Sequence, residues 1–238
     1  FPTRTIAQAM CDVIVHRGTA LTSHYQCGDL YRTDPCTGND LGKEDWRGAF
    51  PSDWGVSAHP KVDDRTGELL YFSYSKQAPY MRYGVVSDAG ELVHKVDVEL
   101  PGPRLPHDMA FTENYVILND FPLFWDPALL EHNLHLPRFH PDIPTRFAVI
   151  PRRGDASQIQ WCEADPTHVL PLRNASEERA EIRAIRNRPT TVSVTSGSVD
   201  SGSWRWIGCR PDCTGGASTW SQARYAKSNC LTASPNSA

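Results

Sequence analysis

The sequence has no long hydrophobic run and no strong excess of charge of either sign. No apolar stretch approaches the roughly 20 residues that a membrane-spanning helix requires, and the formal net charge is only −4 over 238 residues. This balance gives no electrostatic reason to expect a nucleic-acid partner. The first residues include neither an initiator methionine nor an apolar signal segment, which predicts the edge of a larger protein and not a targeting peptide.

Cysteine is too sparse for a fold that depends on disulfides. The seven cysteines are scattered and odd in number, whereas disulfide frameworks belong to short, cysteine-dense secreted chains. This pattern predicts a reducing, cytoplasmic location. Cys209 and Cys213 could form half of a zinc site, but no histidine follows His168 and only Cys230 lies farther downstream. The spacing of potential ligands therefore does not favour zinc.

Up to about residue 182 the sequence consists of short apolar segments separated by turn formers. Strand-like segments cover residues 12–16, 69–75, 80–87 and 91–98, and Asp63–Gly67 is rich in turn formers. In the segment 91–98, side chains alternate with the period of a half-buried strand. Repeated strands with short connections predict an all-β fold, either a β-propeller or a barrel.

Beyond about residue 182 the composition changes abruptly. Residues 183–238 contain no Glu, Phe, Met or His, and 16 of these 56 residues are Ser or Thr. Seven basic residues stand against two acidic ones, and no strand or helix period is sustained. We therefore expect two regions: an all-β region over residues 1–182, and a divergent, disordered, Ser/Thr-rich tail over residues 183–238. The composition of this tail is also typical of out-of-frame translation.

Two histidines carry the clearest chemical signal. His59, in Ser57–Lys61, and His107, followed by Asp108, each precede a strand-like segment. Neutral imidazole suits iron, copper, nickel and zinc, and imidazoles from separate strands can converge on one ion. We predict that His59 and His107 are metal ligands. Taken alone, however, a histidine in such a context is more often a loop or strand-end residue than a metal ligand.

Several blocks of sequence resemble the carotenoid cleavage oxygenase family. They are Ala58–Asp63, Pro106–Tyr115, Pro144–Gly154, Glu163–Leu170 and Asn174–Glu177, which occur in the family's order between residues 11 and 181. The resemblance implies a fragment of a seven-bladed β-propeller, with Fe(II) held on its axis by four histidines that glutamates orient. It implies a dioxygenase that cleaves a conjugated C=C bond of a carotenoid, apocarotenoid or stilbene to carbonyl products.

The same resemblance assigns roles to single residues and to partners. His59 and His107 fall at the first and second iron-ligand positions, and the partners are a hydrophobic alkene substrate and O2. A peripheral contact with a membrane would serve substrate uptake. The aromatic run Phe121–Trp125 could belong to the core, to a substrate tunnel or to such a membrane patch.

The other site positions depart from the family pattern. Pro171 stands where the resemblance places the third histidine, and proline offers no ligand atom. His168 lies three positions earlier, an odd offset that puts it on the opposite face of a strand. No histidine follows to serve as the fourth ligand, and Gln26 occupies the place of the first glutamate. We therefore expect an impaired dioxygenase.

Two other functions stay open on sequence grounds. One is a non-catalytic β-propeller binding module, or an inactive fragment, in which the histidines are structural. The other is a hydrolase of the calcium-bound propeller type, which would require clustered Asp, Asn and Glu ligands on the axis.

Overall fold

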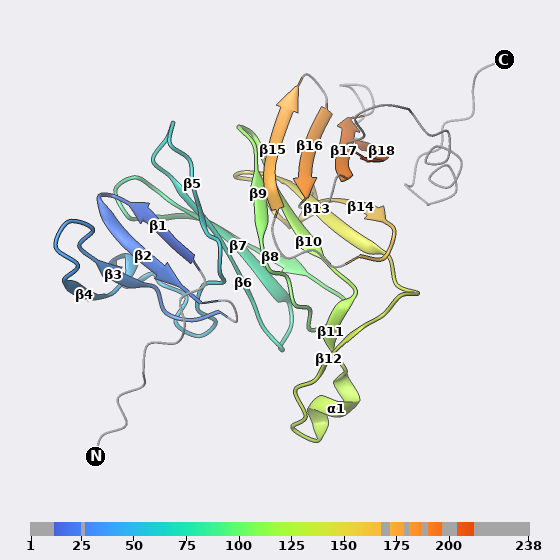
Figure 1. The fold of residues 1–238 in the computed structure, drawn as a ribbon, viewed down its shortest axis with the longest axis horizontal. Coiled ribbons are helices and arrows are strands. Elements are labelled where there is room, and N and C mark those ends of the chain that lie inside the picture. Colours follow the sequence, from blue (N-terminus) through green and yellow to red (C-terminus); the bar gives the residue numbers. More distant parts are fainter. Residues whose placement is uncertain are drawn as a thin grey trace. The chain divides into compact units, whose positions relative to one another are not determined.

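The computed structural model describes residues 12–24, 27–167, 172–178, 181–186, 190–196 and 204–211. Within these ranges the chain is almost entirely β-structure, with one short α-helix, α1 (Pro127–Glu131), and two 3-10 turns, η1 (Trp46–Gly48) and η2 (Ala156–Gln158). The strands form four four-stranded sheets and one two-stranded sheet (Figure 1). No helix in this part of the chain is long and apolar enough to cross a membrane. The all-β prediction is confirmed.

The chain divides into two compact units, Phe1–Asp108 and Met109–Ala238. In the first unit, each sheet is an antiparallel meander in which neighbours in sequence are neighbours in the sheet, the arrangement of a propeller blade. The first strand of each meander is here called its innermost strand. The innermost strands of the two sheets, β1 and β5, contact each other. The two sheets are β1 (Asp12–His16), β2 (Thr19–Ser23), β3 (Tyr31–Thr33) and β4 (Asp40–Lys43), then β5 (Lys61–Val62), β6 (Leu69–Tyr74), β7 (Tyr80–Val86) and β8 (Leu92–Glu99).

The second unit repeats this arrangement with one excursion. Strands β9 (Met109–Phe111), β10 (Tyr115–Asp120), β13 (Thr145–Pro151) and β14 (Gln160–Ala164) form one meander. Between β10 and β13 the chain leaves this sheet to form β11 (Leu123–Trp125), α1 and β12 (Pro137–Phe139) (Figure 1). A further meander follows, with β15 (Leu172–Glu178), β16 (Glu181–Arg186), β17 (Thr190–Ser196) and β18 (Trp204–Pro211).

Regular structure therefore extends past residue 182, where the sequence showed no strand period. Strands β17 and β18 lie wholly beyond that point. A ladder of backbone N–H and C=O groups forms without any alternation of side chains, so composition is a poor guide to it. The division of the chain at residue 182 stays a prediction, but the segment predicted to be a disordered tail contains β17 and β18 among its described residues. Residues 212–238, which include Cys213 and Cys230 of the zinc alternative, lie outside the described residues.

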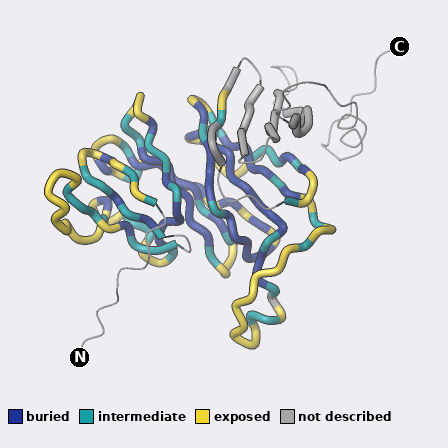
Figure 2. Tube along the Cα trace, in the orientation of Figure 1, coloured by how far each residue is buried: buried dark blue, intermediate teal, exposed yellow. Residues whose placement is uncertain are grey.

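The core of the first unit joins its two sheets. Strand β6 is buried at every position, because it is a central strand with both faces covered, and β7 beside it is mostly buried (Figure 2). Trp46 packs on Tyr71 with ring centroids 4.8 Å apart, and Leu21 of β2 joins the same buried cluster. Burying one such side chain contributes about 1.5–3 kcal/mol. This packing fixes the innermost strands β1 and β5 beside each other.

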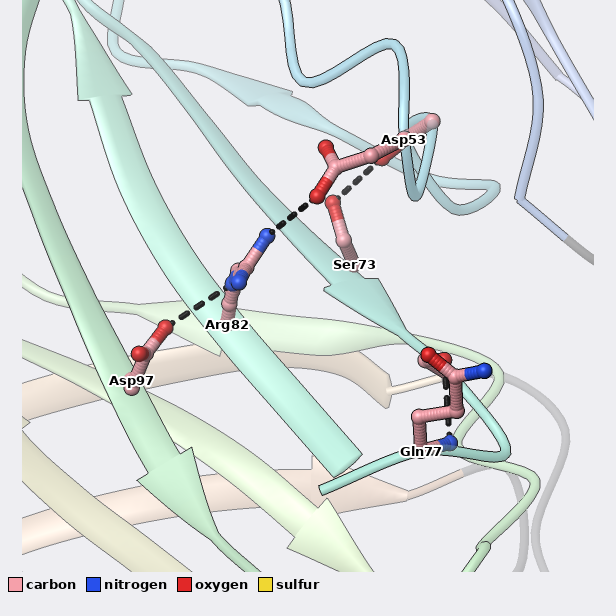
Figure 3. A network of polar contacts seen from close by, with 7 residues as sticks. Asp53, Ser73, Gln77, Arg82 and Asp97 are labelled. Atoms are coloured by element: carbon pink, nitrogen blue, oxygen red, sulfur yellow. Dashed lines mark hydrogen bonds and ion pairs between the residues drawn. The ribbon is translucent and has the colours of Figure 1, made fainter. Parts of the chain in front are cut away.

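A polar network anchors the loop that leads into β5 (Figure 3). Arg82 of β7 donates to Asp97 of β8 over 2.9 Å and to Asp53 of the loop over 3.0 Å. Burial opposes the charge of Arg82, but these two carboxylates outweigh it and raise the guanidinium pKa. Ser73 of β6 also donates to the carbonyl of Gly55 over 2.5 Å. The loop is thus tied to its sheet just before the first predicted ligand.

Candidate metal centre

His59 lies at the end of this anchored loop, two residues before β5 begins. Its neighbours Ala58 and Pro60 are buried, while its own side chain is 21% exposed. The backbone of His59 has φ of +58°, in the left-handed region that residues other than glycine seldom occupy. Such a conformation costs about 1–3 kcal/mol and persists only where the surroundings impose it. The fold therefore holds the imidazole of His59 at a defined place.

His107 occupies the equivalent place in the next meander, two residues before β9 begins. The residues on both sides of it, Pro106 and Asp108, are buried, and His107 itself is half-buried. Like His59, it therefore precedes the innermost strand of a four-stranded meander. Both histidines belong to the unit Phe1–Asp108.

The structure brings these two predicted ligands together. The ring centroids of His59 and His107 lie 4.8 Å apart, and the ring planes are inclined by 41°. Two imidazoles bound at neighbouring positions of one ion would have centroids about 4.5–5.5 Å apart, given metal–nitrogen bonds of about 2.1 Å. The observed centroid separation lies within that range.

A carboxylate that the sequence analysis did not identify contacts this pair. Oδ2 of Asp12, the first residue of β1, lies 2.9 Å from Nδ1 of His59. The other carboxylate oxygen, Oδ1, accepts from the backbone N–H of Val13 over 2.8 Å. No local pattern signals this contact, because Asp12 and His59 are 47 positions apart. Gln26, which the resemblance placed in an orienting role, lies outside the described residues.

An ion pair joins the two segments that carry the histidines. Nζ of Lys61 lies 2.7 Å from Oδ1 of Asp108. The Asp108 side chain is only 3% exposed, and that of Lys61 is 26% exposed. Lys61 follows His59 by two positions, and Asp108 follows His107 directly. This clamp therefore helps to set the spacing between the two imidazoles.

The other parts of the expected ligand set are not seen. Pro171 and His168 lie outside the described residues. Among those that are described, no group of three or more His, Cys, Asp or Glu side chains is placed to hold a metal ion. The two imidazoles fit Fe(II), which accepts neutral nitrogen ligands, as part of a coordination shell.

The other histidines with described contacts have structural surroundings. His16 is buried at the end of β1 and contacts the carbonyl of Gly67 over 3.1 Å. Burial lowers the pKa of His16. His140 stacks on Phe124 with centroids 4.0 Å apart. Neither contact brings a histidine to the pair described above.

The aromatic run Phe121–Trp125 belongs largely to the core of the second unit. Phe121, Phe124 and Trp125 are 1%, 8% and 6% exposed. Phe121 meets Phe147 of β13 edge to face at a centroid distance of 6.2 Å. Of the three roles considered for this run, core packing is the one that these contacts support.

Comparison with known proteins gives this geometry a family context. The family model described as retinal pigment epithelial membrane protein matches residues 1–201, which is most of the chain. The chain belongs to the carotenoid cleavage oxygenases. The match continues past residue 182, where the sequence alone placed the end of the propeller region.

Two relatives show how much of a family member the chain covers. Carotenoid 9,10(9',10')-cleavage dioxygenase 1 of Pisum sativum is 38% identical over 147 residues, which are 60% of this chain and 27% of the relative. Isoeugenol monooxygenase of Pseudomonas nitroreducens is 32% identical over 182 residues, which are 75% of this chain and 37% of the relative. The chain thus spans well under half the length of either relative.

Solved structures of carotenoid oxygenases support the fold. The crystal structure of a lignostilbene dioxygenase from Pseudomonas brassicacearum superposes with a TM-score of 0.64 at 29% identity, and covers 79% of this chain and 38% of that one. Cobalt-substituted apocarotenoid oxygenase from Synechocystis gives a TM-score of 0.60 at 21% identity, covering 79% of this chain and 39% of that one. The fold prediction is confirmed: the chain is all-β and corresponds to part of a seven-bladed β-propeller.

Proposed function

We propose that His59 and His107 bind Fe(II) in a dioxygenase that cleaves a conjugated C=C bond of a carotenoid, apocarotenoid or stilbene to carbonyl products. The observation that carries this proposal is the convergence of the two imidazoles, whose ring centroids lie 4.8 Å apart at the start of two innermost strands. The relatives support the reaction class, since their names describe a carotenoid cleavage dioxygenase, an isoeugenol monooxygenase and a lignostilbene dioxygenase.

The residues of this chain would hold and orient the reacting groups. Bound Fe(II) would supply the activation of O2, which requires a redox-active metal. His59 and His107 would each present a neutral nitrogen to the ion, and the Lys61–Asp108 clamp would keep the two rings at a fixed separation. The substrate would be a hydrophobic alkene, as it is for the family. Because Pro171 replaces the third expected histidine, we infer that this chain is impaired.

Iron stoichiometry tests the ligand assignment. The chain would be loaded anaerobically with Fe(II), desalted and measured beside His59→Ala, His107→Ala and a control, His135→Ala. His135 is an exposed histidine whose Nε2 lies 2.9 Å from Oδ1 of Asn133, two positions away. We expect about one iron per chain, lost in both site variants and kept in the control. Carbonyl products from a stilbene and from an apocarotenoid would then be sought by chromatography.

Each alternative function predicts a different result in the same experiment. A non-catalytic propeller module would stay folded by circular dichroism but would retain no iron. A hydrolase of the calcium-bound type would bind Ca²⁺ equally well without either histidine. Iron retained in both site variants would contradict the assignment of His59 and His107.

The second part of the proposal is a peripheral contact with a membrane, from which the hydrophobic substrate would be taken up. Leu134, Leu136 and Phe139 are 48%, 59% and 44% exposed on the excursion that contains α1 and β12 (Figures 1 and 2). Exposed apolar side chains gathered on one projection are typical of a lipid-contacting surface. Replacing all three by serine should reduce co-flotation with phospholipid vesicles severalfold. Val93→Ser, at a 43% exposed valine of β8, should leave flotation unchanged.

A cytoplasmic location is also part of the proposal. Cys27, Cys36 and Cys162 are free thiols, the state that a reducing compartment maintains. Fractionation of cells that produce the chain would test this, and recovery outside the cytoplasm would contradict it.

A further inference from the structure

We propose that Asp12 is the positioning residue of the metal centre: its carboxylate fixes the His59 imidazole in the form that leaves Nε2 available to a metal ion. This inference rests on the proposed function, since it assigns a partner to one of the proposed ligands. The resemblance to the family did not point to Asp12, and no sequence motif contains it.

The first support is that both carboxylate oxygens of Asp12 are engaged. Oδ2 lies 2.9 Å from Nδ1 of His59, and Oδ1 accepts from the N–H of Val13 over 2.8 Å. The carboxylate is thus held by its own strand while it contacts the ring. A carboxylate only accepts hydrogen bonds, so Nδ1 of His59 must be the donor.

The second support comes from the chemistry of imidazole. A neutral ring carries one proton, and the partner of one nitrogen decides which nitrogen holds it. With the proton on Nδ1 and directed at Asp12, Nε2 keeps its lone pair for a metal ion. Metal-bound histidines commonly have such a carboxylate on the second nitrogen, where it fixes ring orientation and raises ligand basicity.

The third support is the position of Asp12 in the fold. It is the first residue of β1, the innermost strand of its sheet, and β1 contacts β5, which begins two residues after His59. The buried cluster between the two sheets fixes this neighbourhood. Because the backbone of His59 is in the left-handed region, the ring direction is unusual for a chain entering a strand. A hydrogen bond from a neighbouring strand can hold it there.

Asp40 provides a matched control for the test of Asp12. Asp40 is also the first residue of a strand, β4 of the same sheet, and its Oδ1 also accepts a backbone N–H, that of Gly42, over 2.8 Å. Asp40 is exposed, and among the described residues no hydrogen bond or ion pair joins it to a histidine. Asp40→Ala therefore removes the same charge and a similar hydrogen bond without touching the ring of His59. It controls for effects of charge and strand-end capping.

The experiment measures two quantities on the full chain: the protonation form of His59 by ¹⁵N NMR of histidine-labelled protein without metal, and the Kd for Co²⁺ alone by titration of its visible absorption. In the unaltered chain we expect the proton of His59 on Nδ1. In Asp12→Ala we expect it to move largely to Nε2, and the Kd to rise about 10- to 100-fold. Asp12→Asn keeps an accepting oxygen and should show a smaller rise. Asp40→Ala should match the unaltered chain in both measurements.

The possible contrary results separate this inference from the proposed function. If Asp12→Ala leaves both the proton position and the Kd unchanged, the positioning role is wrong. If Asp12→Ala abolishes Co²⁺ binding as completely as His59→Ala while the proton of His59 stays on Nδ1, Asp12 is itself a ligand and the positioning role is wrong. If the unaltered chain keeps the proton on Nδ1 but binds no Co²⁺, the positioning contact is upheld and the proposed metal function fails.

Discussion

The Lys61–Asp108 ion pair provides the sharpest test of how the two histidine segments are held together. Lys61→Met keeps the aliphatic stem of the side chain and removes its charge. Asp108 is 3% exposed and lies 2.7 Å from the ammonium. Two unit charges about 4 Å apart attract by about 4 kcal/mol at an effective dielectric constant near 20. In the intact pair, that attraction offsets the cost of taking the Asp108 carboxylate out of water.

Removing the ammonium leaves this desolvation cost without its compensation. Breaking a fully buried pair costs about 3–5 kcal/mol. Lys61 is 26% exposed, so water already screens part of the attraction, and we expect Lys61→Met to lower the free energy of unfolding by about 2–3 kcal/mol. Asp108→Asn removes the buried charge while keeping the shape. It should cost less, about 1 kcal/mol, the net value of a typical hydrogen bond.

Urea unfolding followed by tryptophan fluorescence measures these values, and a double-mutant cycle gives the coupling between the two positions. The double variant should be more stable than the sum of the single effects predicts, because neither residue then leaves the other's charge unpaired. Strict additivity, or a Lys61→Met effect below about 0.5 kcal/mol, would refute the claim that this pair holds the two segments together.

Three further predictions concern the frame around the site. In Gly84→Ala the new Cβ would lie 2.5 Å from the ring of the buried Tyr71. The free energy of unfolding, measured by urea titration, should therefore fall by about 1–3 kcal/mol. An unchanged unfolding midpoint would contradict this packing. Burial lowers the pKa of His16, so the unfolded state takes up the proton first. Stability present above about pH 6.5 should therefore be lost as pH falls toward the lowered folded-state pKa, and His16→Gln should flatten this dependence. Finally, brief iodoacetamide treatment followed by peptide mass spectrometry should find the exposed Cys36 labelled before Cys27. Burial raises the pKa of the Cys27 thiol to about 12 and keeps the thiol protonated. Equal labelling of the two cysteines would contradict this environment of Cys27.

The strands that the sequence predicted are those whose side chains carry the burial pattern. In β8 the alternation of the segment 91–98 is observed, with Val93 exposed and Val96 and Val98 buried. Strand β6 was predicted from its continuous apolar run, which matches burial on both faces. By contrast β4, with the sequence Asp-Leu-Gly-Lys, is exposed at every position. It forms a strand because its backbone pairs with that of β3. A hydrophobicity pattern does not reveal such backbone pairing.

The candidate site divides in the same way. His59 and His107 were found because each lies in a short block that resembles a known family. Asp12 and the Lys61–Asp108 pair were missed because each contact joins residues far apart in the chain, and a single sequence gives no sign of which distant carboxylate faces which ring. Within the first unit, the contact between β1 and β5 brings Asp12 and the segment of His59 together. A prediction of topology is therefore needed before the surroundings of the ligands can be predicted.

The charges around the two imidazoles give an independent reason to expect a cation there. Lys61 neutralises Asp108 within its own pair, whereas Asp12 contacts the ring of His59 and the backbone N–H of Val13, neither of which carries a permanent positive charge. With both imidazoles neutral, the group formed by His59, His107, Asp12, Lys61 and Asp108 carries a formal charge of about −1. A partly buried excess of negative charge is costly unless something positive approaches it. Either a proton on one of the imidazoles or a divalent ion between the two rings, whose centroids lie 4.8 Å apart, would offset that charge.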